Sequence, residues 1–333
     1  MTFPVWRAIE TGTDYLEDGL CLIADGAQTV PVTNGVPRFV SGEAYTSSFG
    51  LQWNKFQCTQ LDSFSQVPLS RDRLRRCLGE SAWKRLATSV VLECGCGAGR
   101  FTEVLLNEGA SVMSVDLSTA VDANARNFPV TDSHRIAQAD ILALPFAPKS
   151  FDLVICLGVI QHTPDPEATI AALWAHVSDG GTLVIDHYEK GHSGWFHSTK
   201  PLVRALLKGR EPVQAMRVTN RLVDLFFPIH VAVQHAYPLW FLLCRLSPIT
   251  TYLRMYPELN PVAQREWAYL DTHDSLTDYF KHERTREQIH SVLTALGGQQ
   301  IWCVDGGNGV EARAVKPSAS EEDRAIRPSD QGG

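Results

Sequence analysis

The chain of 333 residues lacks the cysteine pattern of a zinc site or of a disulfide framework. Its eight cysteines are scattered and include no Cys-x-x-Cys pair, so we predict reduced thiols in a cytoplasmic protein. An excess of basic residues is also missing. The formal net charge is −7 and the pI is near 5.9, which argues against nucleic acid as a partner. The N-terminus has acidic residues and no apolar run, so we expect no signal peptide.

One stretch, Leu225–Cys244, lacks charged residues for twenty positions and is long enough to span a bilayer. It contains Pro228, Pro238, His230 and His235, which are costly in hydrocarbon. We therefore predict buried or cap helices that break at the prolines. Contact with a membrane surface is the alternative, and the sequence does not indicate an oligomeric state.

The middle of the chain alternates buried strands with helical segments, which predicts an α/β fold. We expect a Rossmann-like, doubly wound sheet of seven strands with the last strand antiparallel, a small N-terminal β segment and a helical cap. The predicted divisions are a ribbon-like β segment at 1–42, a helical N-terminal lid at 43–89, a Rossmann-like core at 90–188, a helical cap for the acceptor at 189–284, a closing helix and hairpin at 285–316, and a disordered tail at 317–333.

A glycine-rich loop follows the first strand of this core. The strand Val90–Glu93 leads into Gly95, Gly97 and Gly99, and an amphipathic helix comes next. Glycines let the backbone approach a nucleotide-like ligand closely because they carry no Cβ. The spacing is Gly-x-Gly-x-Gly, whereas a dinucleotide site has Gly-x-Gly-x-x-Gly.

Three further signals stand at the ends of later strands. Asp116 follows about twenty residues after the loop, where a carboxylate can accept both hydroxyls of a ribose. Asp140 could accept from an adenine amino group, and the run Phe151–His162 comes next. Each acid alone could be a surface or cap residue. Together, at these intervals, they are hard to reconcile with packing alone.

These motifs resemble the class I S-adenosylmethionine-dependent methyltransferases, of the type 11 branch that includes the quinone-biosynthesis enzymes. The resemblance covers residues 88–188 strongly. It implies that S-adenosylmethionine is bound by residues of these four signals: Glu93, Gly95, Gly97 and Gly99 near its amino acid portion, Asp116 at the ribose, Leu117, Asp140 and Ile141 about the adenine, and Leu157. Members of this class often have Asp where this chain has Glu93.

The N-terminal segment resembles the small zinc-ribbon-like segment that precedes many bacterial methyltransferase domains. Only Cys21 remains as a ligand, so we predict no zinc site. Likewise His187, His192 and His197 are five residues apart, which is no metal-binding spacing on a helix, and we predict no metal.

An aromatic stripe of Tyr45, Phe49, Trp53 and Phe56 follows a helical period. Core packing would explain it. The alternative is that this helix closes the cofactor pocket, with Gln52 or Trp53 against the ligand.

If the acceptor is a hydroxyl, a general base helps to remove its proton. His162, just past the fourth strand, is the first candidate, and His187 and Tyr188 after the fifth are next. His162 could equally support the cofactor loop. Asp271, His273 and Asp274 stand in a predicted polar loop at 270–275 and could face the acceptor. Solvation of the loop or helix capping is the simpler explanation.

The leading hypothesis is an enzyme that methylates a small-molecule acceptor, on oxygen rather than nitrogen or carbon. A protein that binds S-adenosylmethionine without turnover, with a regulatory role, is a second hypothesis. An NAD-dependent oxidoreductase is a third, although its third glycine would stand one residue later.

Overall fold

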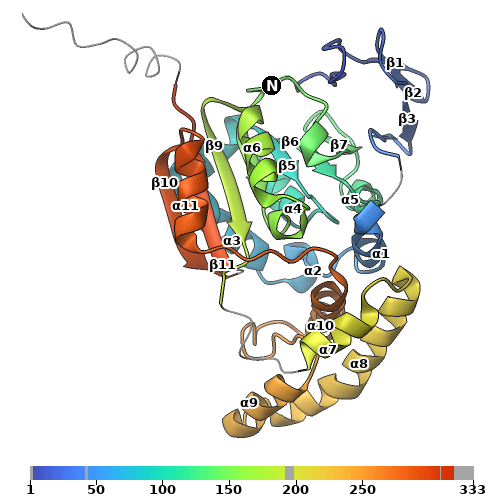
Figure 1. Ribbon diagram of the computed structural model, residues 1–333, viewed down its shortest axis with the longest axis vertical. Coiled ribbons are helices and arrows are strands. Elements are labelled where there is room, and N and C mark those ends of the chain that lie inside the picture. Colours follow the sequence, from blue (N-terminus) through green and yellow to red (C-terminus); the bar gives the residue numbers. More distant parts are fainter. Residues whose placement is uncertain (1–2, 42–43, 192–198, 308, 319–333) are drawn as a thin grey trace, which may run out of the picture.

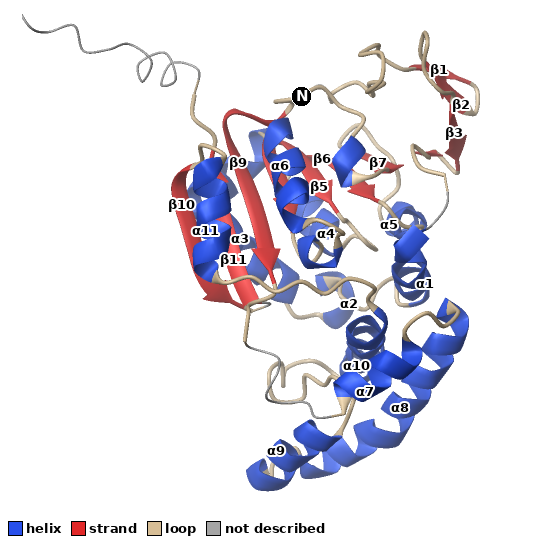
Figure 2. Cartoon of the chain, in the orientation of Figure 1, coloured by secondary structure: helices blue, strands red, loops and turns tan. Residues whose placement is uncertain are grey.

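The computed structural model describes residues 3–41, 44–191, 199–307 and 309–318 (Figure 1). A twisted sheet with helices on both faces forms the centre of the molecule, as the strands and helices of Figure 2 show. A small N-terminal sheet lies to one side, and a group of helices extends from the end where the cavity described below is found (Figure 1). His192, His197 and the predicted disordered residues 319–333 lie outside the described residues.

The central sheet has seven strands. Their bounds are β5 (Val90–Cys94), β6 (Ser111–Asp116), β7 (His134–Gln138), β8 (Phe151–Cys156), β9 (Val177–His187), β10 (Gln299–Gly306) and β11 (Gly309–Val315). The strand order is β10-β11-β9-β8-β5-β6-β7. The strands β7, β6, β5, β8 and β9 pair in parallel, whereas β11 is antiparallel to both β9 and β10. This confirms the predicted sheet and its antiparallel last strand.

Five helices cover the two faces of this sheet. They are α3 (Leu69–Arg85), α4 (Arg100–Asn107), α5 (Ala120–Asn127), α6 (Pro166–His176) and α11 (Arg286–Ala295). Local signals start two of them. The Asp165 side chain accepts from the Ala168 N–H before α6, and Thr285 forms a capping box with Gln288 before α11.

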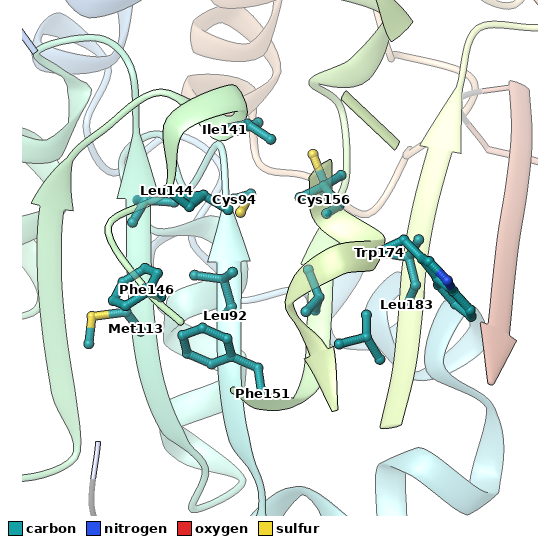
Figure 3. Close-up of a cluster of buried hydrophobic side chains, with 14 of the residues drawn as sticks. Leu92, Cys94, Met113, Ile141, Leu144, Phe146, Phe151, Cys156, Trp174 and Leu183 are labelled. Carbon is teal, nitrogen blue, oxygen red and sulfur yellow. The ribbon is translucent and has the colours of Figure 1, made fainter. Parts of the chain in front are cut away.

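Alternate residues of the central strands pack into two different cores. Leu92 of β5 and Met113 of β6 lie in one core with Phe151 and with Trp174 of α6 (Figure 3). Their chain neighbours, such as Val91, face the opposite core with α3 and α4. Successive side chains of a strand point to opposite faces, so a parallel sheet covered on both faces needs the nearly continuous apolar runs of this sequence.

The N-terminal segment forms an antiparallel sheet of β1 (Leu16–Asp18), β2 (Cys21–Ile23), β3 (Val30–Thr33) and β4 (Val36–Pro37). It is fastened to the core where the Phe39 N–H donates to the Gln138 carbonyl at 2.9 Å and Arg38 pairs with Asp122. Nowhere in the described ranges do three or more His, Cys, Asp or Glu side chains gather as a metal-binding group. The resemblance to a zinc ribbon stays a prediction.

The remaining helices lie around the cavity end of the sheet. They are α1 (Ser47–Lys55), α2 (Asp62–Ser65), α7 (Lys200–Leu207), α8 (Pro212–Val233), α9 (Tyr237–Leu246) and α10 (Pro261–Thr277), with the short 3-10 turns η1 (Ala44–Thr46), η3 (Ile141–Ala143) and η4 (Ile160–His162). The turn η2 (Leu86–Thr88) instead precedes β5 at the opposite end of the sheet. Within the described part of the chain, no helix has the length and apolar character needed to cross a bilayer.

Two predictions about these helices are wrong. Pro228 does not break a helix, since α8 continues through it. Phe227 and His230 beside it are buried, so tertiary packing offsets the backbone hydrogen bond that proline cannot donate. Pro238 stands in the first turn of α9, where proline is tolerated.

Residues 270–275 form part of α10 and are not a loop. Asn260 caps this helix by accepting from the Ala263 N–H at 2.9 Å. His273 looks solvated in the sequence, but it is fully buried and hydrogen-bonded to Ser48 at 2.9 Å and to Thr219 at 3.2 Å. These contacts exist only after α1 and α8 have packed against α10.

Candidate functional site

A cavity of about 450 Å³ lies at the carboxyl ends of β5, β6, β8 and β9, between the sheet and the helices α1, α3 and α10. Ligands bind at this edge of open α/β sheets because the loops between strands and helices leave a crevice there. Its strand side is lined by Gly95, Gly97, Asp116, Leu117, Asp140, Ile141 and Leu157. Its helix side is lined by Tyr252, Tyr256, Trp267, Leu270, Asp271 and Asp274. Phe49, Trp53, Gln161, His162 and Tyr188 also line the cavity.

The glycine loop needs its glycines for two reasons. Gly95, Gly97 and Gly99 have φ values of 72°, 51° and 102°, in the left-handed region that side chains rarely adopt. A Cβ on Gly97 would stand 3.2 Å from the Trp53 ring, which therefore lies directly over the loop. Gly99 does not line the cavity. It caps α4 and faces the Phe128 ring.

Asp116 joins the end of β6 to the glycine loop. Its carboxylate accepts from the Gly97 N–H at 3.0 Å and from the N–H and hydroxyl of Ser118 at 2.8 and 2.7 Å. Burial raises the pKa of this carboxyl, while these hydrogen bonds act in the opposite direction. A carboxylate has about four acceptor positions, so acceptor capacity remains for a ligand hydroxyl.

Asp140 stands at the outer part of the strand side. One of its oxygens, Oδ1, accepts from the Leu142 N–H at 2.9 Å and so caps the short turn that holds Ile141. Burial, with the charges of Asp140 and Asp116, raises the pKa of Tyr45 to about 12. Tyr45 thus keeps its proton and can act as a hydrogen-bond donor in the cavity.

Glu93 lies beneath the cavity and does not line it. Its side chain is 2% exposed and accepts from Thr102 at 2.5 Å and from Ser114 at 3.0 Å. Burial raises the pKa of Glu93 to about 7. Its other oxygen, Oε1, has no hydrogen-bond partner among the described residues. The structure therefore places Glu93 as a support below the loop, and its contact with a cofactor stays a prediction.

His162 is held by the backbone on one side of its ring. Nδ1 lies 3.1 Å from the Phe280 carbonyl, so Nδ1 donates and Nε2 carries the lone pair. The rings of Phe49 and Tyr188 are each 5.3 Å from its own. Burial lowers the pKa of His162, and the neutral form that can take up a proton therefore predominates near neutral pH.

The other two candidate bases differ from each other in position. Tyr188 lines the cavity, and burial raises its pKa well above the ordinary value, so it stays a neutral phenol. His187 is fully buried, with Nδ1 3.0 Å from the Tyr188 carbonyl, and does not line the cavity. His162 and Tyr188 thus lie together at the cavity, whereas the His187 side chain is buried outside it.

The helix side contains residues that the sequence motifs do not indicate. Tyr252 and Tyr256 pack around Trp267 with ring centroids 5.1 and 5.6 Å away. Burial raises the pKa of Asp271 to about 7, against the effect of its hydrogen bond with Tyr252. The sequence signal for this side is the acidic pair Asp271 and Asp274, which the sequence predicts to lie in a polar loop that could face the acceptor.

Arg100 lines the cavity between the two sides, and no sequence motif indicates it. Its Nε donates to the Ser70 hydroxyl at 3.0 Å and its Nη1 to the Gln60 amide oxygen at 3.1 Å. The guanidinium also stands 5.5 Å from the Trp267 ring.

Gln52, which lines the cavity and is 2% exposed, has an amide oxygen with no hydrogen-bond partner in the described part of the chain. A bound ligand can satisfy such an orphaned acceptor.

The strand order, the glycine loop and the acid at the end of β6 define the class I methyltransferase fold, as the sequence resemblance implies. Comparison with known proteins agrees. Residues 92–185 match the family model described as "Methyltransferase domain". Residues 92–185 thus form a methyltransferase domain with the class I fold, the kind of domain that takes S-adenosylmethionine as its cofactor. This confirms the predicted family and cofactor.

Curated relatives match a stretch of similar length. The ubiquinone biosynthesis O-methyltransferase of Pseudomonas fluorescens is 35% identical over 101 residues, 29% of this chain and 44% of the relative. Its counterpart from Methylococcus capsulatus is 33% identical over 102 residues, with 29% and 43% covered. The chain therefore spans less than half the length of these relatives. Human N-acetylserotonin methyltransferase, solved with S-adenosylmethionine, has a TM-score of 0.43 at 15% identity, covering 84% of this chain and 61% of that one.

The strand side fits S-adenosylmethionine by its own geometry. The glycine loop leaves room that a Cβ would fill, and Asp116 and Asp140 present carboxylates at two neighbouring loops. Trp53 covers the loop from above, and the orphaned Gln52 oxygen can accept from a ligand ammonium or amide.

Proposed function

We propose that this protein transfers the methyl group of S-adenosylmethionine to an oxygen atom of a small-molecule acceptor. The observation that carries the proposal is the continuity of the cavity, because one space of about 450 Å³ joins the strand side to the helix side. A cofactor at the glycine loop and an acceptor beside α10 would share that space. The names of the curated relatives support oxygen as the methylated atom.

The proposed cofactor contacts follow the strand side. Gly95, Gly97 and Gly99 form the loop at its amino acid portion, Asp116 accepts from the ribose, Asp140 with Leu117, Ile141 and Leu157 surrounds the adenine, and Trp53 covers the loop. Gly99 acts through the backbone turn that it permits, since it does not line the cavity.

The proposed chemistry is an in-line displacement. Bound S-adenosylmethionine supplies an electrophilic methyl group on a sulfonium. Neutral His162 would accept the hydroxyl proton of the acceptor at Nε2, and the acceptor oxygen would take the methyl group that the bound cofactor supplies. Alignment within the cavity lowers the entropic cost of the reaction. Tyr188, edge-on to His162, holds the imidazole plane and donates from its phenol.

The helix side supports an acceptor with a flat apolar body and hydrogen-bond donors. Tyr252, Tyr256 and Trp267 offer aromatic surfaces, while Asp271 and Asp274 offer acceptor oxygens. A phenol that also donates hydrogen bonds satisfies both features.

The test is transfer of labelled methyl from S-adenosylmethionine to metabolite extract, with mass spectrometry of the labelled product. A labelled ether or ester is the expected result. Binding of S-adenosylmethionine without any labelled product would favour the regulatory hypothesis, and a labelled amine or carbon centre would overturn oxygen as the target. Thermal stabilisation by NAD alone would contradict the proposal altogether.

A further inference from the structure

The helices that follow the central core expose much of their apolar surface. Residues 199–256, here called the arm, contain α7, α8 and α9, which extend away from the sheet (Figure 1). The arm returns to the cavity at Tyr252 and Tyr256. Eleven of the twenty-one exposed large hydrophobic side chains in the described ranges lie in these 58 residues. Such a concentration marks a contact surface, whereas isolated exposed leucines need no explanation.

The helix α9 shows this feature most clearly. It has the sequence YPLWFLLCRL, and none of its ten residues is buried. Leu239, Leu242 and Leu246 recur at i, i+3 and i+7 and are 57%, 54% and 54% exposed. This spacing places them on one face of the helix. Each of these three side chains is thus more than half exposed.

A second apolar stripe lies on α7. Leu202 and Leu206, one turn apart, are 68% and 67% exposed. The cationic side chain of Arg204 on the same helix turns inward and donates to the Ser275 and Asp278 carbonyls of the α10 end. The helix therefore turns Arg204 inward and presents Leu202 and Leu206 to the outside, while Leu207 is buried.

The charge of the arm indicates what covers these stripes. It contains eight Lys and Arg but only two acidic residues, a net charge of +6, which leaves −13 for the rest of a chain of net charge −7. The two acids are engaged locally: Glu211 caps α8, and Asp224 pairs with Arg265. Two of the cations also face the protein, since Lys200 donates to the Thr250 hydroxyl and Arg204 pairs with Asp278. Arg217 and Arg221, one turn apart and exposed on α8, have no ion-pair partner within the described residues.

We propose that the arm docks on an anionic lipid surface, with α7 and α9 lying in the headgroup region. Apolar helix faces bordered by basic residues bind at such interfaces through buried apolar area and attraction to anionic headgroups. None of the arm's helices is long and apolar enough to span the bilayer, so the contact is a surface one. A second copy of the arm fits less well, because each copy carries +6.

The experiment is co-sedimentation of the full chain with vesicles of phosphatidylcholine plus phosphatidylglycerol, and with phosphatidylcholine alone. The protein is expected to bind the anionic vesicles and to be released by added salt, because salt screens the headgroup charge. The double variant Leu239→Gln/Leu242→Gln is expected to bind at least about tenfold more weakly, since two leucines no longer leave water. Arg217→Gln/Arg221→Gln should weaken binding to the anionic vesicles only.

A matched control is Leu16→Gln/Leu20→Gln, which changes two leucines of the N-terminal segment that are 69% and 78% exposed. It should bind vesicles as the unchanged protein does. The proposal is overturned if Leu239→Gln/Leu242→Gln and Leu16→Gln/Leu20→Gln lose vesicle binding equally. It is also overturned if the unchanged protein does not sediment with the vesicles. A stable dimer that dissociates in Leu239→Gln/Leu242→Gln would instead make a second copy the occupant. The cofactor affinity of all these variants should stay unchanged, which separates this inference from the proposed function.

Discussion

The two sides of the cavity are built from the chain in different ways. The strand side comes from residues 95–157, where each contributing loop follows directly on a strand of one sheet. The helix side comes from residues 252–274, which must pack against α1 and α3 from nearly two hundred residues earlier in the chain.

The difference extends to the chemistry of the two sides. On the strand side the polar atoms hold one another: Asp116 fixes the backbone of Gly97, and Asp140 fixes that of Leu142. On the helix side the carboxylates belong to a helix face and are surrounded by aromatic rings. The strand side is thus preorganised by its own hydrogen bonds, whereas the helix side depends on side chains that packing brings together. The following predictions test that division.

The largest effect is expected at the junction of the two sides. His162→Ala should lower turnover by about 10²–10⁴-fold, the usual contribution of a general base. Cofactor affinity, measured by calorimetry, should change little, because His162 is not part of the glycine loop. Since burial lowers its pKa from 6.5, the acidic limb of the pH–rate profile of the unchanged protein should lie below pH 6.5. His290→Ala, at an exposed position, is the control. Full turnover in His162→Ala would show that His162 is not the general base.

Beneath the strand side, Glu93 should make stability depend on pH. Its folded pKa of about 7 lies above the ordinary 4.5, so the folded state favours the protonated form. Ionisation therefore costs on the order of 3 kcal/mol, and stability falls as pH rises through this interval. Glu93→Gln should flatten the fall, measured by urea unfolding at several pH values. The exposed Glu10→Gln should leave it intact, and an unchanged pH dependence in Glu93→Gln would show that Glu93 ionises freely.

Asp116→Ala should weaken S-adenosylmethionine binding at least about tenfold, because it removes a charge-assisted acceptor and releases the Gly97 N–H. Calorimetric titration measures the affinity, with the exposed Asp132→Ala as the matched control. Equal affinities in these two variants would refute the ribose role of Asp116.

The smallest effect is expected on the helix side. Asp271→Asn should raise the acceptor KM about tenfold, as expected for one lost hydrogen bond to a charged group. Cofactor affinity should stay the same. Steady-state kinetics with the acceptor identified by methyl labelling measures the first quantity, and Asp224→Asn on the outer face of α8 is the control. A drop in cofactor affinity as large as that in Asp116→Ala would break the division between the two sides.

The amino-acid sequence alone is sufficient for the sheet and for most of the strand side. Apolar runs of strand length and glycines at alternate positions specify local backbone geometry, and the acids stand immediately after the strands. Such features depend only on neighbouring residues, and for this reason the order of the motifs places Asp116 and Asp140 beside the glycine loop. Glu93 is harder to place, because the one-residue alternation of a strand decides whether its carboxylate faces the cavity or Thr102 and Ser114.

Only the tertiary structure decided the helix side and the arm. Polar residues such as Thr272 and His273 give α10 no clear apolar period, yet packing buries them with hydrogen-bond partners from α1, α8 and the Thr250 backbone. The sequence predicts a helix break at Pro228, but the buried residues around it keep α8 continuous. In each case the free energy of burial and pairing between distant segments outweighs the local preference, and that balance cannot be calculated from neighbours in the sequence.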